Sequence, residues 1–181
     1  MTAAGKTRLL DAPEIDRILT RLAHEIVERY GTVENVGLIG IRTRGEFIAS
    51  RLVSKLKGLT GRTVPLGFLD VTFYRDDFRE RLIQPQVKGT EIPFSLDGLT
   101  VILADDVLYT GRTVRAALDE IMDFGRPARV TVAVLVDRGH REMPIKGDFV
   151  GKNIPTADNE HVLVRLKEVD GRDGVYLVRY D

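Results

Sequence analysis

Two adjacent carboxylates, Asp105 and Asp106, stand just before a short turn, Thr110–Thr113, and this segment carries the clearest chemistry in the chain. An ionised carboxylate only accepts hydrogen bonds, so the hydroxyls of a sugar, which donate them, are natural partners. The first backbone N–H groups of a helix lack partners within the helix and bind phosphate readily. Carboxylates, a glycine in the turn and its two threonine hydroxyls together predict a site for a phosphorylated ribose.

The residues around this turn predict a strand followed by a helix. The apolar run Val101–Leu103 is typical of a buried parallel strand, and apolar residues recur at helical spacing over residues 114–124. Ligands of open α/β sheets usually bind beyond the carboxyl ends of the strands, where both carboxylates stand. The alternative is that these are solvated loop residues, but the coincidence of carboxylates, glycine and hydroxyls favours a site.

The glycine pattern excludes two common nucleotide motifs. The segment is not a Walker loop, because Asp106 occupies the place of the first glycine and no Gly-Lys-Ser/Thr follows. Gly37, Gly40 and Gly45 do not have the spacing of a dinucleotide fingerprint.

A second strand-to-helix turn, Gly40–Gly45, contains Arg42, Thr43 and Arg44. Its backbone N–H groups and two arginines are suited to a second anion. The alternative is a tight turn with solvated arginines, and the presence of the other phosphate site favours an anion.

Strands and helices alternate along most of the chain. We expect helices over residues 13–29, 46–57 and 114–124, and strands over 36–41, 64–69, 99–104 and 130–136. This alternation predicts an α/β fold, a central parallel sheet flanked by helices. Residues 70–91 are charged and lack periodicity, which predicts a long mobile loop or a loose hairpin. Short strands over 162–166 and 175–178 predict a small C-terminal hood, so we expect a single domain, residues 1–181, with its core at about 13–136 and its hood at about 137–181.

Composition limits the class of protein. The 181 residues include 27 basic and 27 acidic side chains, for a net charge of zero, so any binding of nucleic acid requires a local basic patch. The absence of cysteine excludes disulfides and thiolate metal sites and favours a cytoplasmic location. No membrane-spanning run and no signal-peptide pattern is present, so no membrane partner is expected.

Several separate segments together resemble one known family. They are Ile18–Glu25, Gly40–Gly45, Tyr74–Asp77, Val101–Val114, Val136–Glu142 and Gly151–Pro155. The segment Val101–Val114 alone is similar to the motif with which type I phosphoribosyltransferases bind phosphoribosyl pyrophosphate (PRPP). The joint set resembles the bifunctional pyrimidine operon regulators that are also uracil phosphoribosyltransferases, and this resemblance covers nearly the whole chain.

The resemblance implies a reaction that converts uracil and PRPP to UMP and pyrophosphate, with Mg²⁺ held mainly by PRPP and no metal site formed by the protein alone. Asp105, Asp106 and Arg44 would be catalytic. The resemblance assigns PRPP and nucleotide binding to Arg42, Thr43, Gly45, Val107, Leu108, Tyr109, Thr110, Gly111, Arg112 and Thr113. It places Tyr74, Arg75 and Arg79 on the mobile loop.

The resemblance also implies a site for the base, formed by Asp137, Phe149 and Val150. Phe149 would stack on the base and the Val150 backbone would read its edge, although Phe149 also fits a core residue beneath the hood. Purine enzymes carry a lysine at the position of Asp137, so its absence argues against a 6-oxopurine. Purine enzymes carry an aspartate at the position of Tyr109, which is a poor base at neutral pH, so we expect no strong side-chain general base.

A second function implied by the resemblance is binding of the messenger RNA leader of pyrimidine operons in response to UMP or UTP. The candidate residues are Arg17, Thr20, Arg21, His24, Arg29, Lys146 and Lys152. The first four are spaced to share one face of the helix 13–29, which otherwise fits a plain solvated face. Two alternatives are an RNA-binding nucleotide sensor with vestigial catalysis and a purine phosphoribosyltransferase without an RNA role. The resemblance also implies a homo-oligomer, a dimer or larger.

Overall fold

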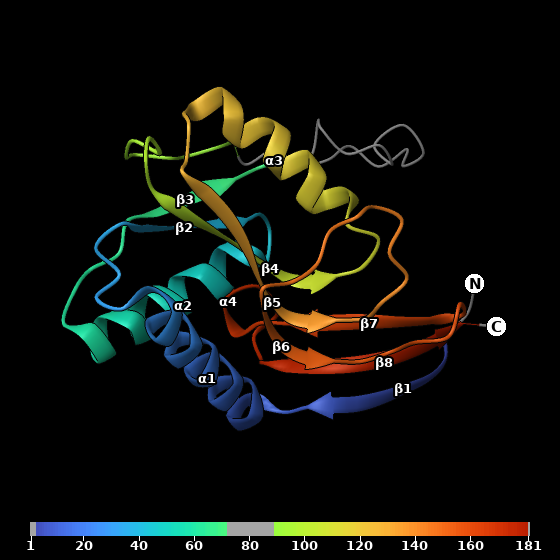
Figure 1. Cartoon of the computed structure of the whole chain (residues 1–181). Helices are drawn as coiled ribbons and strands as arrows, with labels where there is room; N and C mark the ends of the chain where they lie inside the picture. Colours follow the sequence, from blue (N-terminus) through green and yellow to red (C-terminus); the bar gives the residue numbers. More distant parts are fainter. Residues whose placement is uncertain (1–2, 72–88, 181) are drawn as a thin grey trace.

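The computed structural model describes residues 3–71 and 89–180, and within them the chain forms two sheets (Figure 1). The larger sheet has five parallel strands in the order β3-β2-β4-β5-β6. Their bounds are β2 (Val36–Ile41), β3 (Leu66–Leu69), β4 (Thr100–Leu108), β5 (Arg129–Asp137) and β6 (Phe149–Asn153). The smaller, antiparallel sheet has the order β1-β8-β7, with β1 (Ala3–Leu10), β7 (Glu160–Arg165) and β8 (Gly174–Tyr180).

Helices cover both faces of the parallel sheet. They are α1 (Ala12–Tyr30), α2 (Gly45–Thr60) and α3 (Arg112–Phe124), with a short α4 (Lys167–Asp170) near the end of the chain. In Figure 1, α1 and α2 lie on one side of the sheet and α3 lies on the other. The predicted central parallel sheet flanked by helices is therefore confirmed. None of the helices described here is long and apolar enough to cross a membrane.

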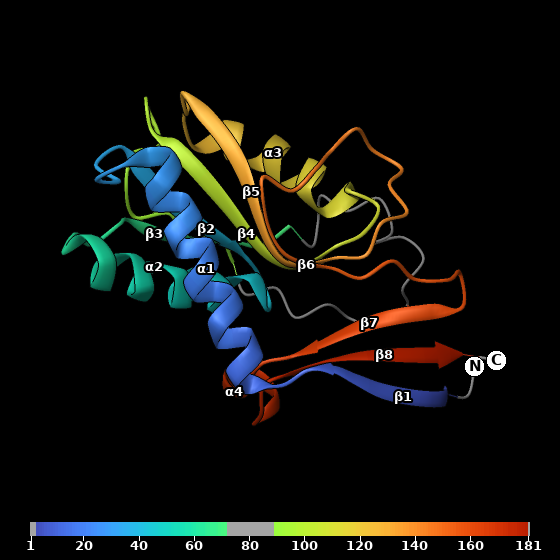
Figure 2. The same ribbon diagram turned by 60° about the horizontal axis from the view of Figure 1, so that its bottom comes forward.

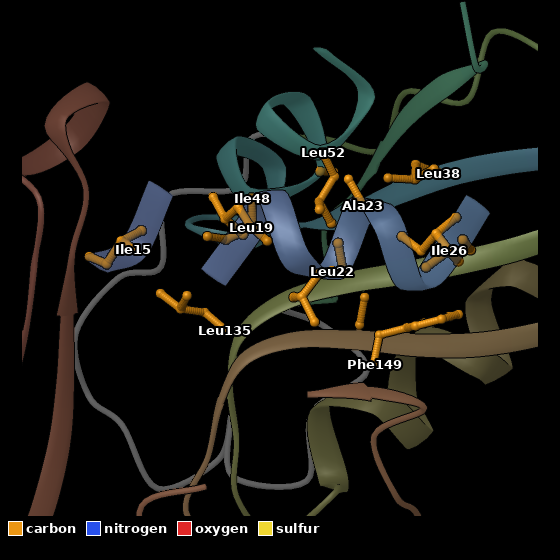
Figure 3. Packing of buried hydrophobic residues seen from close by; sticks show 14 of the residues in the cluster. Ile15, Leu19, Leu22, Ala23, Ile26, Leu38, Ile48, Leu52, Leu135 and Phe149 are labelled. Atoms are coloured by element: carbon orange, nitrogen blue, oxygen red, sulfur yellow. The ribbon is translucent and has the colours of Figure 1, made fainter. Parts of the chain in front are cut away.

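The core between α1, α2 and the sheet positions β2, β4 and β5 (Figure 3). Ile15, Leu19 and Leu22 of α1 are fully buried in one cluster with Ile48 and Leu52 of α2, and Leu19 lies beside Ile48. Their spacing of three and four residues forms one apolar stripe on α1. A reciprocal capping box between Asp11 and Glu14 begins this helix.

The hood differs from the sequence prediction at both of its boundaries. β6 pairs in parallel with β5, so residues 149–153 belong to the core sheet rather than to the hood. The N-terminal β1, which was not predicted, pairs with β8 and completes the hood sheet, shown beside the core in Figure 2. Both errors have one cause: these strands pair with partners that local sequence patterns do not identify.

β4 is longer than predicted, and this places Asp105 and Asp106 within the strand. The ladder with β5 continues through Asp105, which pairs with Val134, to Leu108, which pairs with Asp137. Pairing with a neighbouring strand overrides the low strand propensity of aspartate. The two carboxylates are therefore held by a sheet and not by a loop.

Candidate active site

The turn between β4 and α3 presents backbone donors to a cavity. Gly111 precedes the helix with φ +90°, a left-handed conformation that favours glycine, and a Cβ there would lie 3.1 Å from the Met143 Cβ. Among the described residues, no group accepts a hydrogen bond from the N–H of Thr113 or Val114. These N–H groups, with the positive end of the helix dipole, form a site for an anion.

Asp105 and Asp106 are held by hydrogen bonds from the backbone beside them. Asp106 N donates to Asp105 Oδ1 at 2.9 Å, and Val107 N donates to Asp106 Oδ1 at 2.8 Å. Burial raises the pKa of Asp106, while the positive charge of Arg44 opposes this shift. The fold thus places at the cavity a carboxylate whose ionised form is disfavoured by burial, and it places the Arg44 cation close enough to offset part of that penalty.

The turn between β2 and α2 lies directly against β4. A Cβ on Gly45 would lie 2.4 Å from the Ala104 carbonyl oxygen, so only glycine allows this approach. The peptide bond between Arg42 and Thr43 is cis. Arg42 forms ion pairs with Glu46 and Glu91. The two strand-to-helix turns therefore meet at the switch point of the sheet, between β2 and β4.

Both turns open into one cavity of about 680 Å³, a size usual for a small-molecule site. Every residue predicted to be catalytic or to bind PRPP lines it, except Gly45, which packs beside it. These lining residues are Arg42, Thr43, Arg44, Asp105, Asp106, Val107, Leu108, Tyr109, Thr110, Gly111, Arg112 and Thr113.

Arg138, Glu142 and Val162 also line the cavity, and the sequence did not identify them as site residues. Arg138 is only 4% exposed, and its guanidinium carbon lies 3.9 Å from the centre of the Tyr109 ring. Burial lowers the pKa of Arg138, but an arginine remains cationic. The sequence signal was the segment Val136–Glu142, in which Arg138 lies directly beside the predicted site residue Asp137.

Two hydrogen bonds fix the Arg138 guanidinium against the hood. Nε donates to Thr156 Oγ1 at 3.1 Å, and Nη2 donates to the Glu160 carbonyl oxygen at 2.7 Å. Nη1 makes no hydrogen bond within residues 3–71 and 89–180. Arg138 thus brings a buried cation with an unused N–H edge to the end of the cavity beside β7.

Comparison with known proteins shows which family has this arrangement. Residues 5–169 match the model of the phosphoribosyl transferase domain. The chain belongs to this family. The bifunctional protein PyrR of Pelotomaculum thermopropionicum is 55% identical over 97% of each chain. The bifunctional protein PyrR of Roseiflexus sp. is 56% identical over 97% of this chain and 96% of the relative. These relatives confirm the resemblance to a bifunctional family that the motifs indicated.

Solved structures of the phosphoribosyltransferase family confirm the type I fold. Hypoxanthine phosphoribosyltransferase from Trypanosoma cruzi, in complex with the product IMP, matches with a TM-score of 0.73 at 20% identity. The match covers 99% of this chain and 92% of the T. cruzi chain. A hypoxanthine phosphoribosyltransferase from Staphylococcus aureus has a TM-score of 0.71 at 19% identity, covering 96% of this chain and 92% of its own. Likeness at this level of identity concerns the fold and not the substrate.

The predicted contacts of Phe149 and Val150 with the base are corrected by the structure. Phe149 is 3% exposed and packs against the Tyr30 ring on the α1 face of the sheet (Figure 3). It pairs with Ala133 in the middle of β5, away from the carboxyl ends of the strands. The backbone of Val150, which was predicted to read the edge of the base, does not line the cavity, and its carbonyl oxygen accepts a hydrogen bond from Arg21. Side chains alternate along a strand, so the Val150 side chain packs on the α3 face. Stacking of Phe149 on the base is therefore wrong; it is a core residue of this phosphoribosyltransferase.

Asp137 does not line the cavity either. It forms an ion pair with Arg141 and accepts a hydrogen bond from Gly139 N at 3.0 Å. Arg141 in turn donates to the carbonyl oxygens of Tyr109 and Ile145. Asp137 thus stabilises the segment that carries Arg138. Its predicted direct contact with the base is therefore corrected: it supports the residues around the cavity and does not line the cavity itself.

Three of the residues predicted to bind RNA gather in a groove between α1 and β6. Arg17, Arg21 and Lys152 line it, together with Leu10, Glu14, Ile18 and Gly151. Arg21 is tied in place, because it forms an ion pair with Glu25 and donates to the carbonyl oxygens of Val150 and Gly151. The groove is therefore basic, but Glu14 and Glu25 reduce its charge.

The other RNA candidates do not line this groove. Thr20 accepts a hydrogen bond from Lys55 at 2.8 Å, and His24 Nδ1 lies 2.8 Å from the Thr20 carbonyl oxygen. Arg29 forms an ion pair with Asp148 at 3.6 Å near the end of α1. Lys146 is exposed in the segment before β6. The loop predictions, Tyr74, Arg75 and Arg79, lie outside the described residues.

Proposed function

We propose that the protein is a uracil phosphoribosyltransferase that converts uracil and PRPP to UMP and pyrophosphate. One observation carries this proposal: two strand-to-helix turns border the same cavity together with Asp105 and Asp106, and the N–H groups of Thr113 and Val114 in one of these turns have no acceptor among the described residues. PRPP carries two anionic groups separated by a ribose, and this order of donors and acceptors matches it. The relatives named bifunctional protein PyrR support the same reading.

The 5′-phosphate of PRPP binds the N-terminus of α3 at Thr113 and Val114. The ribose hydroxyls donate to Asp105 and Asp106, whose negative charge also stabilises the positive charge that develops on the ribose as pyrophosphate leaves. Pyrophosphate binds the β2–α2 turn, where the positive charge of Arg44 partly neutralises its negative charge. Catalysis in this arrangement rests on holding the reacting groups in line and neutralising charge.

Mg²⁺ fits this site as a partner of PRPP rather than as a resident of the protein. No cluster of three metal-ligating side chains exists among the described residues, but the carboxylates of Asp105 and Asp106 are the oxygen donors that Mg²⁺ prefers. Asp105 and Asp106 would hold the ion together with PRPP, and the ion would neutralise charge on the leaving pyrophosphate.

The uracil ring occupies the end of the cavity formed by Arg138, Tyr109 and Val162. Arg138 Nη1 donates to a uracil carbonyl, and cytosine is disfavoured because it presents an amino group in place of one carbonyl. The Tyr109 ring packs against Arg138, which fits a packing role rather than that of a general base.

Steady-state assays with uracil, cytosine, hypoxanthine and guanine test the activity. Of these four bases, we expect only uracil to be turned over. Arg138→Met should raise the KM for uracil roughly tenfold, while the KM for PRPP changes less than about twofold. Arg115→Met, an exposed arginine of α3 paired with Asp119, is the matched control. Turnover of a purine would favour the purine enzyme, and UMP binding without any turnover would favour a nucleotide sensor.

We also propose that the protein binds a messenger RNA leader through the groove between α1 and β6. Arg17 and Lys152 converge there from different elements, and single-stranded loops of RNA bind such basic surfaces. The groove lies outside the catalytic cavity, since the two share no lining residue. RNA binding that responds to UMP or UTP would give the protein its second function.

The RNA surface is tested with Lys152→Gln, because Arg21 also supports β6. Gel shifts should show weaker binding of a pyrimidine leader RNA, and the dependence of log affinity on log salt should lose about one unit of slope. Lys57→Gln, an exposed lysine on α2, is the control. An equal loss of RNA binding and uracil turnover in Lys152→Gln would contradict two separate surfaces.

A further inference from the structure

Arg44 uses only one edge of its guanidinium within the protein. Nε and Nη2 donate to the two carboxylate oxygens of Asp170, at 3.0 to 3.3 Å. Nη1 makes no hydrogen bond in the described parts of the chain, and Arg44 lines the cavity. A guanidinium is planar and rigid, so holding one edge determines where the other points.

Asp170 is itself held by α4, which lies beside α2 (Figure 1). Leu166 N donates to Asp170 Oδ2 at 2.9 Å, so the same carboxylate oxygen accepts from the backbone and from Arg44. Burial acts to raise the pKa of Asp170, but the hydrogen bonds from Arg44 and Leu166 hold it below its ordinary value. Asp170 is thus a fixed, ionised acceptor and not a flexible surface group.

We propose that Asp170 is a positioning residue for PRPP: it holds the Nε and Nη2 edge of Arg44 so that the opposite edge faces the pyrophosphate. This inference rests on the proposed function. An untethered arginine loses side-chain freedom when it binds an anion, and Arg44 has lost that freedom before PRPP arrives. Asp170 acts through Arg44 and does not line the cavity itself.

A neighbouring pair separates positioning from a merely structural role. Arg51 of α2 donates to both carboxylate oxygens of Asp173 at 2.8 Å. Asp173 also accepts a backbone hydrogen bond, from Lys167 N at 2.7 Å. Arg51 also donates to both carboxylate oxygens of Glu168. Both arginines therefore connect the α4 region to α2 through a carboxylate that also accepts from the backbone, but neither Arg51 nor Asp173 lines the cavity.

The test compares Asp170→Asn with Asp173→Asn by steady-state kinetics and by calorimetric titration with PRPP and Mg²⁺. Asp170→Asn should raise the KM and Kd for PRPP roughly tenfold, with kcat and the KM for uracil within about twofold of wild type. Asp173→Asn should leave all four quantities within about twofold, although both variants lose thermal stability. Asp170→Glu, which keeps the charge, should recover part of the PRPP affinity.

A double-mutant cycle shows whether Asp170 acts through Arg44. In an Arg44→Gln background, Asp170→Asn should cause no further loss of PRPP affinity. The proposal would be overturned if Asp170→Asn and Asp173→Asn lost PRPP affinity equally. It would also be overturned if Asp170→Asn reduced PRPP affinity as much in the Arg44→Gln background as in wild type. If the wild-type protein binds PRPP but turns over no base, the proposed function fails, while the calorimetric comparison still decides the role of Asp170.

Discussion

At the scale of single residues, the site combines groups that favour binding at the expense of stability. Asp106 is the clearest case, because burial raises the pKa of its carboxyl and only partial relief comes from Arg44. A raised pKa means that the folded protein binds a proton more tightly than the unfolded chain does. Stability is therefore lost as pH rises from the unfolded pKa, about 3.8, through the higher folded value.

Asp106→Asn should consequently be more stable than wild type at pH 7 and should bind PRPP more weakly. The amide oxygen still accepts from Val107 N, while the cost of a buried charge disappears. We expect a rise in Tm of about 2–4 °C, corresponding to about 1 kcal/mol, measured by calorimetry. The difference should vanish below the unfolded pKa of about 3.8, where both side chains are neutral. A lower Tm for Asp106→Asn at pH 7 would contradict this account.

At the scale of elements, the site depends on how closely α2 approaches β4. Gly45 begins α2 where a Cβ would lie 2.4 Å from the Ala104 carbonyl oxygen and 3.1 Å from the Asp105 Cα. Both neighbours are backbone atoms of a central strand, so they cannot move aside as a flexible side chain could. Gly45 therefore determines the distance between the two anion-binding turns.

Gly45→Ala should destabilise the protein by roughly 1–3 kcal/mol, as overpacking does, and should raise the KM for PRPP. Gly58→Ala is the matched control, because Gly58 lies in the same helix and a Cβ there would meet no atom within 4 Å. That substitution should stabilise the protein by about 0.5–1 kcal/mol, since alanine favours helix. Urea unfolding measures both changes, and a similar effect of the two variants would refute the argument from close approach.

At the scale of the whole molecule, both ends of the chain build the hood. β1 lies at the edge of the hood sheet, where its Lys6 pairs with Val178 and its Leu10 pairs with Val175. β8 lies between β1 and β7, and β7 carries Val162, which lines the cavity. The strand at the start of the chain thus supports the end of the cavity proposed for uracil, whereas the core sheet supports the end proposed for PRPP.

Deletion of residues 1–9, which keeps Leu10 and the helix cap Asp11, should affect the two substrates differently. We expect the KM for uracil to rise roughly tenfold and the KM for PRPP to change less than about twofold, since only the hood loses a strand. Steady-state kinetics with each substrate varied in turn makes the comparison. Equal changes in both KM values would show that β1 supports the whole molecule and not the hood alone.

The sequence by itself determined the parallel sheet, both strand-to-helix turns and nearly all the residues that line the PRPP end of the cavity. These features are local: an apolar strand, a turn and a helix start follow one another within a dozen residues. Only the tertiary structure decided that β1 joins the hood, that β6 joins the core and that Arg138 rather than Phe149 reaches the cavity. Strand partners and the face to which each side chain points depend on pairing between distant segments, and a shift of one residue reverses the face.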